Sequence, residues 1–176
     1  MRSEFTIYKR GHEDYYLVSA GAMERHDWDC LSKFAPKNSS FKLNKITSST
    51  GVLVLVGPRS RDLLINLTSS DLTNDAFPWL TGKTIHVGAA EVEALRVNFV
   101  GELGWELHHP IEMQNYIFDE LFRVGADYEL KPFGIRAMDS LRLEKSYRLI
   151  PREMSIEYSA LESGLDRFVK LDKEHD

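Results

Sequence analysis

Glu106 is the residue whose surroundings most clearly suggest chemistry. It lies in residues 99–110, FVGELGWELHHP, where one alternating run leads through Gly-Glu-Leu-Gly into a second. This pattern predicts a β-hairpin with Trp105 and Leu107 on one face of the second strand and Glu106 and His108 on the other. A carboxylate fixed on a strand can accept two parallel N–H bonds from a flat heterocycle, such as the 2-amino-pyrimidinone edge of a pterin. The alternative is a surface hairpin whose polar face contacts water.

A second group of charged residues lies on a predicted helix that follows Gly134. Asp139 and Arg142 are three residues apart, and Arg136 and Lys145 add further charge around the helix. Residues at this spacing are neighbours on a helix surface, so ordinary ion pairs are the simplest interpretation. A functional role is the alternative.

Composition excludes several classes of protein. The chain has 176 residues, 43% of them hydrophobic, which is enough for one real core, so a single domain over 1–176 is expected. A net charge of -5 without a basic cluster argues against a nucleic-acid partner. The longest apolar run, 52–56, is far shorter than the roughly 20 residues that cross a bilayer, so no membrane association is expected.

Cysteine and histidine usage predicts no metal site. Cys30 is the only cysteine, so it cannot form an internal disulfide, and a reduced, intracellular setting fits best. His26 lies four residues before it on a predicted helix, but no base or third ligand accompanies the two. We therefore expect both side chains to serve packing.

Hydrophobic periodicity predicts an α+β fold with an antiparallel or mixed sheet and packed helices. The expected strands cover residues 5–9, 15–19 and 41–47, a buried central strand at 52–56, then 83–87, 92–99 and a last strand at 167–171. The expected helices cover residues 21–34, 60–67, 111–124 and a segment after Gly134.

Local signals predict how several of these elements begin and end. Ser60 is expected to cap the start of the helix at 60–67, and Gly125 is expected to cap the end of the helix at 111–124. Residues 57–61 are expected to form a helix-entry turn, because they lack the spacing of a phosphate-binding loop. Residues 69–82 are expected to pack as an ordered connection through Phe77, Trp79 and Leu80.

Three stretches in the C-terminal half carry a family resemblance. They are FVGELGWELHHP, KPFGIRAMDSLRLEKSYRL and SALESGLDRFVKLDK. In this order they resemble landmarks of the aminomethyltransferase superfamily, the folate-binding family of the glycine cleavage T-protein. The forms found here are most similar to the tetrahydrofolate domain of dimethylglycine and sarcosine dehydrogenases.

The resemblance implies roles for four residues. Glu106 matches the glutamate that anchors the pterin, and Phe99 stands where the T-protein has a tyrosine lining the folate cleft. A folate-contacting arginine of the T-protein is replaced here by Met138. Arg136 and Arg142 lie nearby, and either is a candidate for binding the glutamate tail of folate.

The resemblance also implies that the chain is an internal fragment. Family members begin with a segment that carries an acidic residue beside the reactive folate nitrogen, and only Glu4 lies near that position. They continue into a small β-barrel domain after the last landmark. No residue is assigned a catalytic role, and we expect the fragment alone to be inactive.

The implied function is transfer of a methylene group from a glycine-derived amine to tetrahydrofolate. Any FAD would belong to a flavin domain absent from this chain, because no Gly-x-Gly-x-x-Gly occurs. The alternatives are a free-standing glycine cleavage aminomethyltransferase, with a lipoyl carrier protein as partner, and a non-enzymatic folate-binding paralogue of the iron–sulfur assembly type. The expected location is the bacterial cytoplasm or the mitochondrial matrix.

Overall fold

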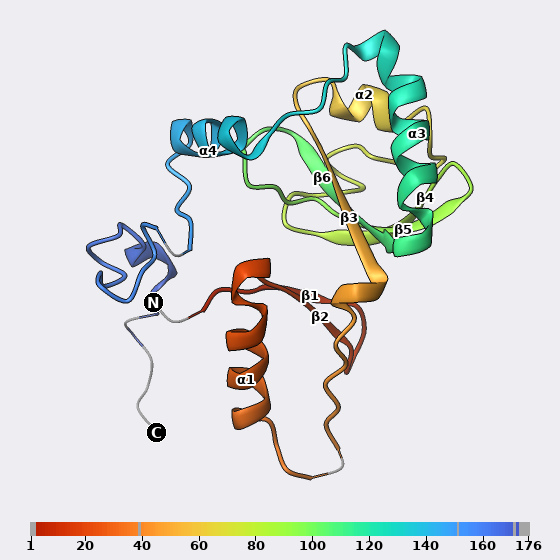
Figure 1. Ribbon diagram of the computed structural model, residues 1–176. Coiled ribbons are helices and arrows are strands. Elements are labelled where there is room, and N and C mark those ends of the chain that lie inside the picture. The colour runs from red at the N-terminus through yellow and green to blue at the C-terminus, as the bar shows by residue number, and fades with distance from the viewer. Residues whose placement is uncertain (1–2, 39, 151, 171, 173–176) are drawn as a thin grey trace. The chain divides into compact units, whose positions relative to one another are not determined.

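The computed structural model describes residues 3–38, 40–150, 152–170 and 172 (Figure 1). The chain divides into two compact units, one formed by Met1–Leu43 with Arg148–Asp176 and the other by Asn44–Tyr147. No helix in these described ranges is long and apolar enough to span a membrane.

The first unit contains the predicted N-terminal hairpin and helix. Strands β1 (Thr6–Lys9) and β2 (Tyr15–Val18) pair antiparallel, with Thr6 opposite Val18. A 3₁₀ turn, η1 (Gly21–Met23), then leads into α1 (Glu24–Phe34). Both predictions are confirmed, because the polar turn and the apolar periodicity act within short stretches of chain.

The predicted strand at 167–171 does not form over its described part. Residues Asp166–Phe168 form a 3₁₀ turn, η5. The amides of Phe168 and Val169 donate to the carbonyls of Leu165 and Asp166, so they are not available to a neighbouring strand. Leu171 lies outside the described residues.

The second unit is built on a four-stranded antiparallel sheet. Its strands are β3 (Thr50–Val56), β4 (Gly82–Val87), β5 (Ala90–Leu95) and β6 (Gly104–Pro110), in the order β3-β6-β5-β4. The strand predicted at 41–47 does not form: residues 41–46 lack regular structure, and a 3₁₀ turn, η2 (Thr47–Ser49), precedes β3. The predicted α+β class with an antiparallel sheet is confirmed.

The composition of residues 52–56 predicted a central strand, and this prediction is wrong. β3 is an edge strand of this sheet, and Val52 and Val54 are exposed. An uninterrupted apolar run indicates that both faces of a strand are hydrophobic, but it does not indicate where the strand lies in the sheet. The position of β3 follows from its pairing with β6.

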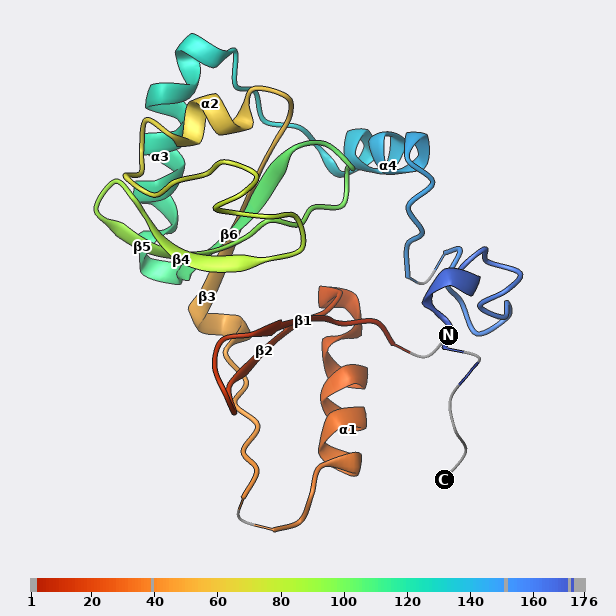
Figure 2. The same ribbon diagram turned by 180° about the vertical axis from the view of Figure 1, so that it is seen from behind.

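Helices cover one face of the sheet. α2 (Ser60–Leu64) and α3 (Gln114–Gly125) lie on the same side of it, as both views show (Figures 1 and 2). η3 (Ile111–Met113) leads into α3, and η4 (Ala126–Tyr128) follows it. The buried core includes Trp105 and Leu107 of β6, Leu63 and Leu64 of α2, and Ile117 and Leu121 of α3.

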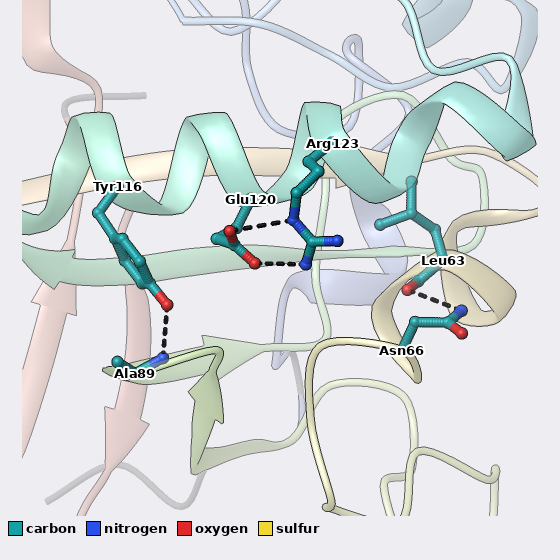
Figure 3. Close-up of polar contacts among 6 residues, drawn as sticks. All are labelled: Leu63, Asn66, Ala89, Tyr116, Glu120 and Arg123. Carbon is teal, nitrogen blue, oxygen red and sulfur yellow. Dashed lines mark hydrogen bonds and ion pairs between the residues drawn. The ribbon is translucent and has the colours of Figure 1, made fainter.

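One polar contact ties α3 to the sheet beneath it, and two others are local to α3 and to the end of α2 (Figure 3). The backbone N–H of Ala89, in the turn between β4 and β5, donates to the Tyr116 hydroxyl at 2.8 Å. Further along α3, Arg123 pairs with Glu120. The Asn66 amide donates to the Leu63 carbonyl at 3.4 Å, where it helps to close the end of α2.

Two predicted helix boundaries form by different means than expected. Ser60 is the first residue of α2 and not its cap, because its hydroxyl donates to the Leu103 carbonyl at 3.0 Å. Gly125 is the last residue of α3 and has φ -61°, which is ordinary helical geometry. A glycine fits there because an added Cβ would lie 2.6 Å from the Leu130 side chain. Glu129 takes the left-handed conformation, at φ 58°.

The connection 65–81 between α2 and β4 contains most of the segment 69–82 that was expected to pack through Phe77, Trp79 and Leu80, and only part of that prediction is confirmed (Figure 2). Leu72 and Phe77 are buried in the core, whereas Trp79 and Leu80 are exposed. The last helix of this unit, α4 (Ile135–Glu144), follows residues 129–134.

The predicted hairpin around Gly-Glu-Leu-Gly has a longer loop than its pattern indicated. β5 ends at Leu95 and β6 begins at Gly104, so residues 96–103 form the loop. Asn98 organises this loop: its side-chain oxygen accepts from the amides of Val100 and Gly101, and its amide donates to the Glu102 carbonyl. Arg96 still exchanges backbone hydrogen bonds with Leu80 and Thr81, and beyond Arg96 these local bonds replace strand pairing.

Candidate functional site

Glu106 and His108 form a contact on the sheet face opposite the helices. Nε2 of His108 lies 3.2 Å from Oε2 of Glu106. The alternation predicted for this strand is confirmed, since Trp105 and Leu107 face the core while these two side chains share the other face. The rigid strand therefore fixes the position of the carboxylate.

The neighbours of Glu106 leave its carboxylate partly accessible. Val54 of β3 and Leu95 of β5 are its partners in the register, and neither carries a group that can bond to it. The Glu106 side chain is 23% exposed, whereas that of His108 is 2% exposed. A carboxylate has several lone-pair positions, so one contact with His108 leaves capacity for N–H donors of a ligand.

The three other predicted site residues come from the 96–103 loop and α4. Arg142 is fully buried, and its Cζ lies 5.9 Å from the centre of the half-buried Phe99 ring. The Phe99 ring in turn lies 6.4 Å from that of Tyr147. The structure thus brings Phe99 and Arg142 together, while Arg136 is exposed at the start of the same helix.

Arg142 is engaged within the protein. Its Nε donates to Asp139 at 2.6 Å, and its Nη1 donates to the backbone carbonyl of Tyr147 at 2.7 Å. The predicted spacing of Asp139 and Arg142 is confirmed as an ion pair, but the arginine is a buried residue and not a surface one. Lys145 pairs with Glu102 at 3.6 Å, which links the end of α4 to the loop.

A pocket of about 330 Å³ lies elsewhere in this unit and contains no predicted site residue. It is lined by Leu55, Ser60, Leu63, Tyr128, Leu130 and Lys131, among others. The residues 57–61 beside it form the helix-entry turn that was predicted, with the Ser60 amide donating to the Gly57 carbonyl.

Neither a metal site nor a catalytic acid is evident in the described residues. Within those ranges, no group of three or more His, Cys, Asp or Glu side chains is placed to hold a metal ion. Glu4 of the first unit precedes β1, and desolvation raises the pKa of its carboxyl. No catalytic role is assigned to it.

Comparison with known proteins places this geometry in a family. Residues 1–173 match the GCVT N-terminal domain. The chain belongs to this family. The GCVT N-terminal domain generally binds tetrahydrofolate, and the match runs across both compact units.

Curated relatives of this GCVT domain include dehydrogenases and an aminomethyltransferase. The chain is 36% identical over 175 residues to human mitochondrial dimethylglycine dehydrogenase, covering 99% of this chain and 20% of that protein. It is 37% identical over 159 residues to mouse mitochondrial sarcosine dehydrogenase, covering 89% and 17%. It is 30% identical over 173 residues to an aminomethyltransferase of Thermoanaerobacter sp. strain X514, covering 97% and 46%.

One relative is named as a regulatory subunit. The mouse pyruvate dehydrogenase phosphatase regulatory subunit is 31% identical over 172 residues, covering 97% of this chain and 20% of that protein. The chain therefore spans about a fifth of the length of the two dehydrogenases and of this subunit. The relatives therefore include enzymes and a protein named as a regulatory subunit.

A solved structure supports the fold. The chain matches heterotetrameric sarcosine oxidase from Corynebacterium sp. U-96 with a TM-score of 0.57 and 15% identity, over 73% of this chain and 63% of that one. At this identity the match shows the fold alone.

His108 is the site residue that sequence reasoning left without a role. Its place on the same face as Glu106 followed from the alternation of the strand. Its contact with the carboxylate did not follow, because side chains two residues apart on a strand meet only when their rotamers allow it.

Proposed function

We propose that this chain binds tetrahydrofolate through Glu106 and serves as the folate domain of a one-carbon transfer enzyme of the dimethylglycine or sarcosine dehydrogenase type. One observation carries the proposal. Glu106 is held on a strand whose other face is fixed in the core, while its carboxylate remains partly accessible on the opposite face.

Glu106 would bind the pterin by accepting two N–H groups from its 2-amino-pyrimidinone edge. His108 would hold the carboxylate in one orientation through the contact at Oε2. Because that contact is made beforehand, less conformational entropy would be lost when the ligand binds. Phe99 would offer an aromatic face for the folate ring system.

Arg136 would contact the glutamate tail of folate, and Arg142 would act as a positioning residue. Arg136 is exposed, and its guanidinium would bind a ligand carboxylate through two N–H groups. Arg142 is committed to Asp139 and the Tyr147 carbonyl. Its contact with the Phe99 ring would instead keep that ring in place.

Bound tetrahydrofolate would supply the nucleophilic nitrogen that takes up carbon at the oxidation level of formaldehyde. The chain would contribute orientation and exclusion of water. The carbon donor would be a glycine-derived amine, oxidised on a flavin domain elsewhere in the full-length protein. A mitochondrial matrix or bacterial cytoplasmic location would suit this role, and the two dehydrogenase relatives are named as mitochondrial.

A free-standing glycine cleavage aminomethyltransferase is the second candidate. The bacterial aminomethyltransferase relative favours it, because this chain covers 46% of that shorter protein. In that case a lipoyl carrier protein would deliver the carbon. The full-length protein distinguishes the two: formation of 5,10-methylenetetrahydrofolate would depend on dimethylglycine or sarcosine in one case and on an aminomethyl-lipoyl carrier in the other.

Calorimetric titration with tetrahydrofolate tests the binding proposal. Glu106→Gln should weaken binding by about 1–3 kcal/mol, the scale for a hydrogen bond to a charged group. Glu91→Gln is the matched control, since it makes the same charge change at an exposed position of β5 on the same sheet face. Equal affinity of wild type and Glu106→Gln, or no binding by the folded chain, would contradict the proposal.

A further inference from the structure

Two arginines converge on one neutral oxygen at the side of the sheet that α2 covers. Nη2 of Arg61 donates to Oδ1 of Asn74 at 2.6 Å, and Nη2 of Arg96 donates to the same oxygen at 2.8 Å. Two positive charges are thereby held a few ångströms apart. Desolvation by burial, and then the charge of Arg61, lower the pKa of the Arg96 guanidinium.

The acceptors in this cluster are all uncharged. Besides Asn74, Arg96 donates through Nη1 to the backbone carbonyl of Phe77. In the described part of the chain, no carboxylate forms an ion pair with Arg61 or Arg96. The usual partner of a partly buried arginine in a folded protein is a carboxylate or a phosphate, which the planar guanidinium binds through two N–H groups.

Three buried N–H donors of the cluster have no acceptor. They are Nε of Arg61, Nε of Arg96 and Nε1 of Trp105. Trp105 is fully buried, and Cζ of Arg61 lies 6.0 Å from the centre of its ring. A buried donor without a partner costs free energy, so a group of three around two guanidinium ions indicates that an acceptor is missing.

Rigid elements hold the cluster together. Arg61 lies on α2, Asn74 and Phe77 lie in the connection 65–81, and Arg96 directly follows β5. Phe77 is buried and packs 6.1 Å from the Trp105 ring. The two arginines are therefore fixed before any ligand arrives, which lowers the entropy lost on binding.

We propose that Arg61 and Arg96 form a binding site for an oxyanion, the phosphate or carboxylate group of a small ligand. One such group carries enough lone pairs to accept from both guanidinium groups, and its negative charge offsets their repulsion. The site shares no residue with Glu106, His108, Phe99 or Arg142, so it stands independently of folate binding.

Titration of the ¹⁵N-labelled chain with inorganic phosphate and, separately, with acetate tests this site by NMR. We expect saturable shifts of the Arg61 and Arg96 Nε–H signals and of the Trp105 indole signal, with the tighter ligand identifying the preferred group. The indole signal of Trp28, in the first unit, serves as the internal reference. Shifts that sodium chloride reproduces at equal ionic strength, or no saturable shift, would overturn the proposal.

Variants show which side chains are responsible. Arg61→Gln should weaken binding of the preferred anion by roughly tenfold or more, because it removes one charged donor group. Arg123→Gln is the matched control, since it neutralises an exposed arginine of α3 that already has Glu120 as its partner, and it should leave affinity unchanged (Figure 3). Equal losses in both variants would overturn the assignment, and the wild-type titration decides by itself if Arg61→Gln does not fold.

Discussion

His108 and Glu106 couple a buried ring to an accessible carboxylate. Their closest atoms, Nε2 and Oε2, are 3.2 Å apart on the face of β6 that the helices do not cover. Only 2% of the His108 side chain is exposed, against 23% of Glu106. Any change at the ring therefore acts directly on the residue proposed to bind the pterin.

A double-mutant cycle should detect this coupling. We expect Glu106→Gln and His108→Gln to lower the free energy of unfolding by unequal amounts, with an interaction term of about 1 kcal/mol between them. Urea denaturation of the two single variants and the double variant measures it. Effects that add within about 0.3 kcal/mol would mean that the contact contributes nothing to stability.

Replacing Arg142 should destabilise the second unit. Arg142→Leu removes a fully buried guanidinium together with its hydrogen bonds to Asp139 and to the Tyr147 carbonyl. We expect the free energy of unfolding to fall by about 2–4 kcal/mol. This is less than the cost of breaking a fully buried pair from one side, because the Asp139 side chain is 25% exposed. Urea denaturation followed by tryptophan fluorescence measures the loss.

Arg136→Leu is the control for that prediction. It makes the same substitution on the same helix at an exposed position, so the free energy of unfolding should change by no more than about 0.5 kcal/mol. If both variants lost equal stability, the burial of Arg142 would not be the cause. In the folate titration the order should reverse, with Arg136→Leu weakening binding directly.

Features that depend on neighbouring residues in the chain could be predicted from the sequence. The alternation of Trp105, Glu106, Leu107 and His108 fixed the two faces of β6, and apolar periodicity located α1 and α3. These signals are local, because side chains return to the same face at every second residue of a strand and after each turn of a helix.

Features that depend on tertiary packing could not be predicted. Arg142 lay in a pattern of surface charges, yet it is the most buried residue of α4, while Ile135 and Leu143 on that helix are exposed. The edge position of β3 and the convergence of Arg61 and Arg96 on Asn74 likewise join residues far apart in the chain. Periodicity carries no information on such contacts.

Gly125→Ala should destabilise the protein through steric contact. The added Cβ would lie 2.6 Å from the Leu130 side chain, so either that side chain or the end of α3 must shift. Overpacking of this kind costs about 1–3 kcal/mol. Gly134→Ala is the control, because a Cβ there meets no atom within 4 Å. A thermal melt in which Gly125→Ala matched the wild type would show that Leu130 moves aside freely.

The pair on the outer face of α3 should give a measurable pH dependence (Figure 3). Arg123 donates to both carboxylate oxygens of Glu120, at 3.1 and 2.6 Å. These hydrogen bonds, and then the charge of Arg123, lower the pKa of the Glu120 carboxyl. The stabilisation is therefore present above the pKa of Glu120 in the unfolded chain and is lost as the pH falls through its lower pKa in the folded chain.

Arg123→Gln should return the Glu120 titration to the range of an ordinary glutamate. Carboxyl ¹³C NMR measures both midpoints, and the wild-type midpoint should be the lower one. The difference in stability between the two proteins should be small, greatest near neutral pH, and absent in acid, since protonated Glu120 no longer accepts the charged bonds. Identical midpoints in the two proteins would show that Arg123 and Glu120 do not pair in solution.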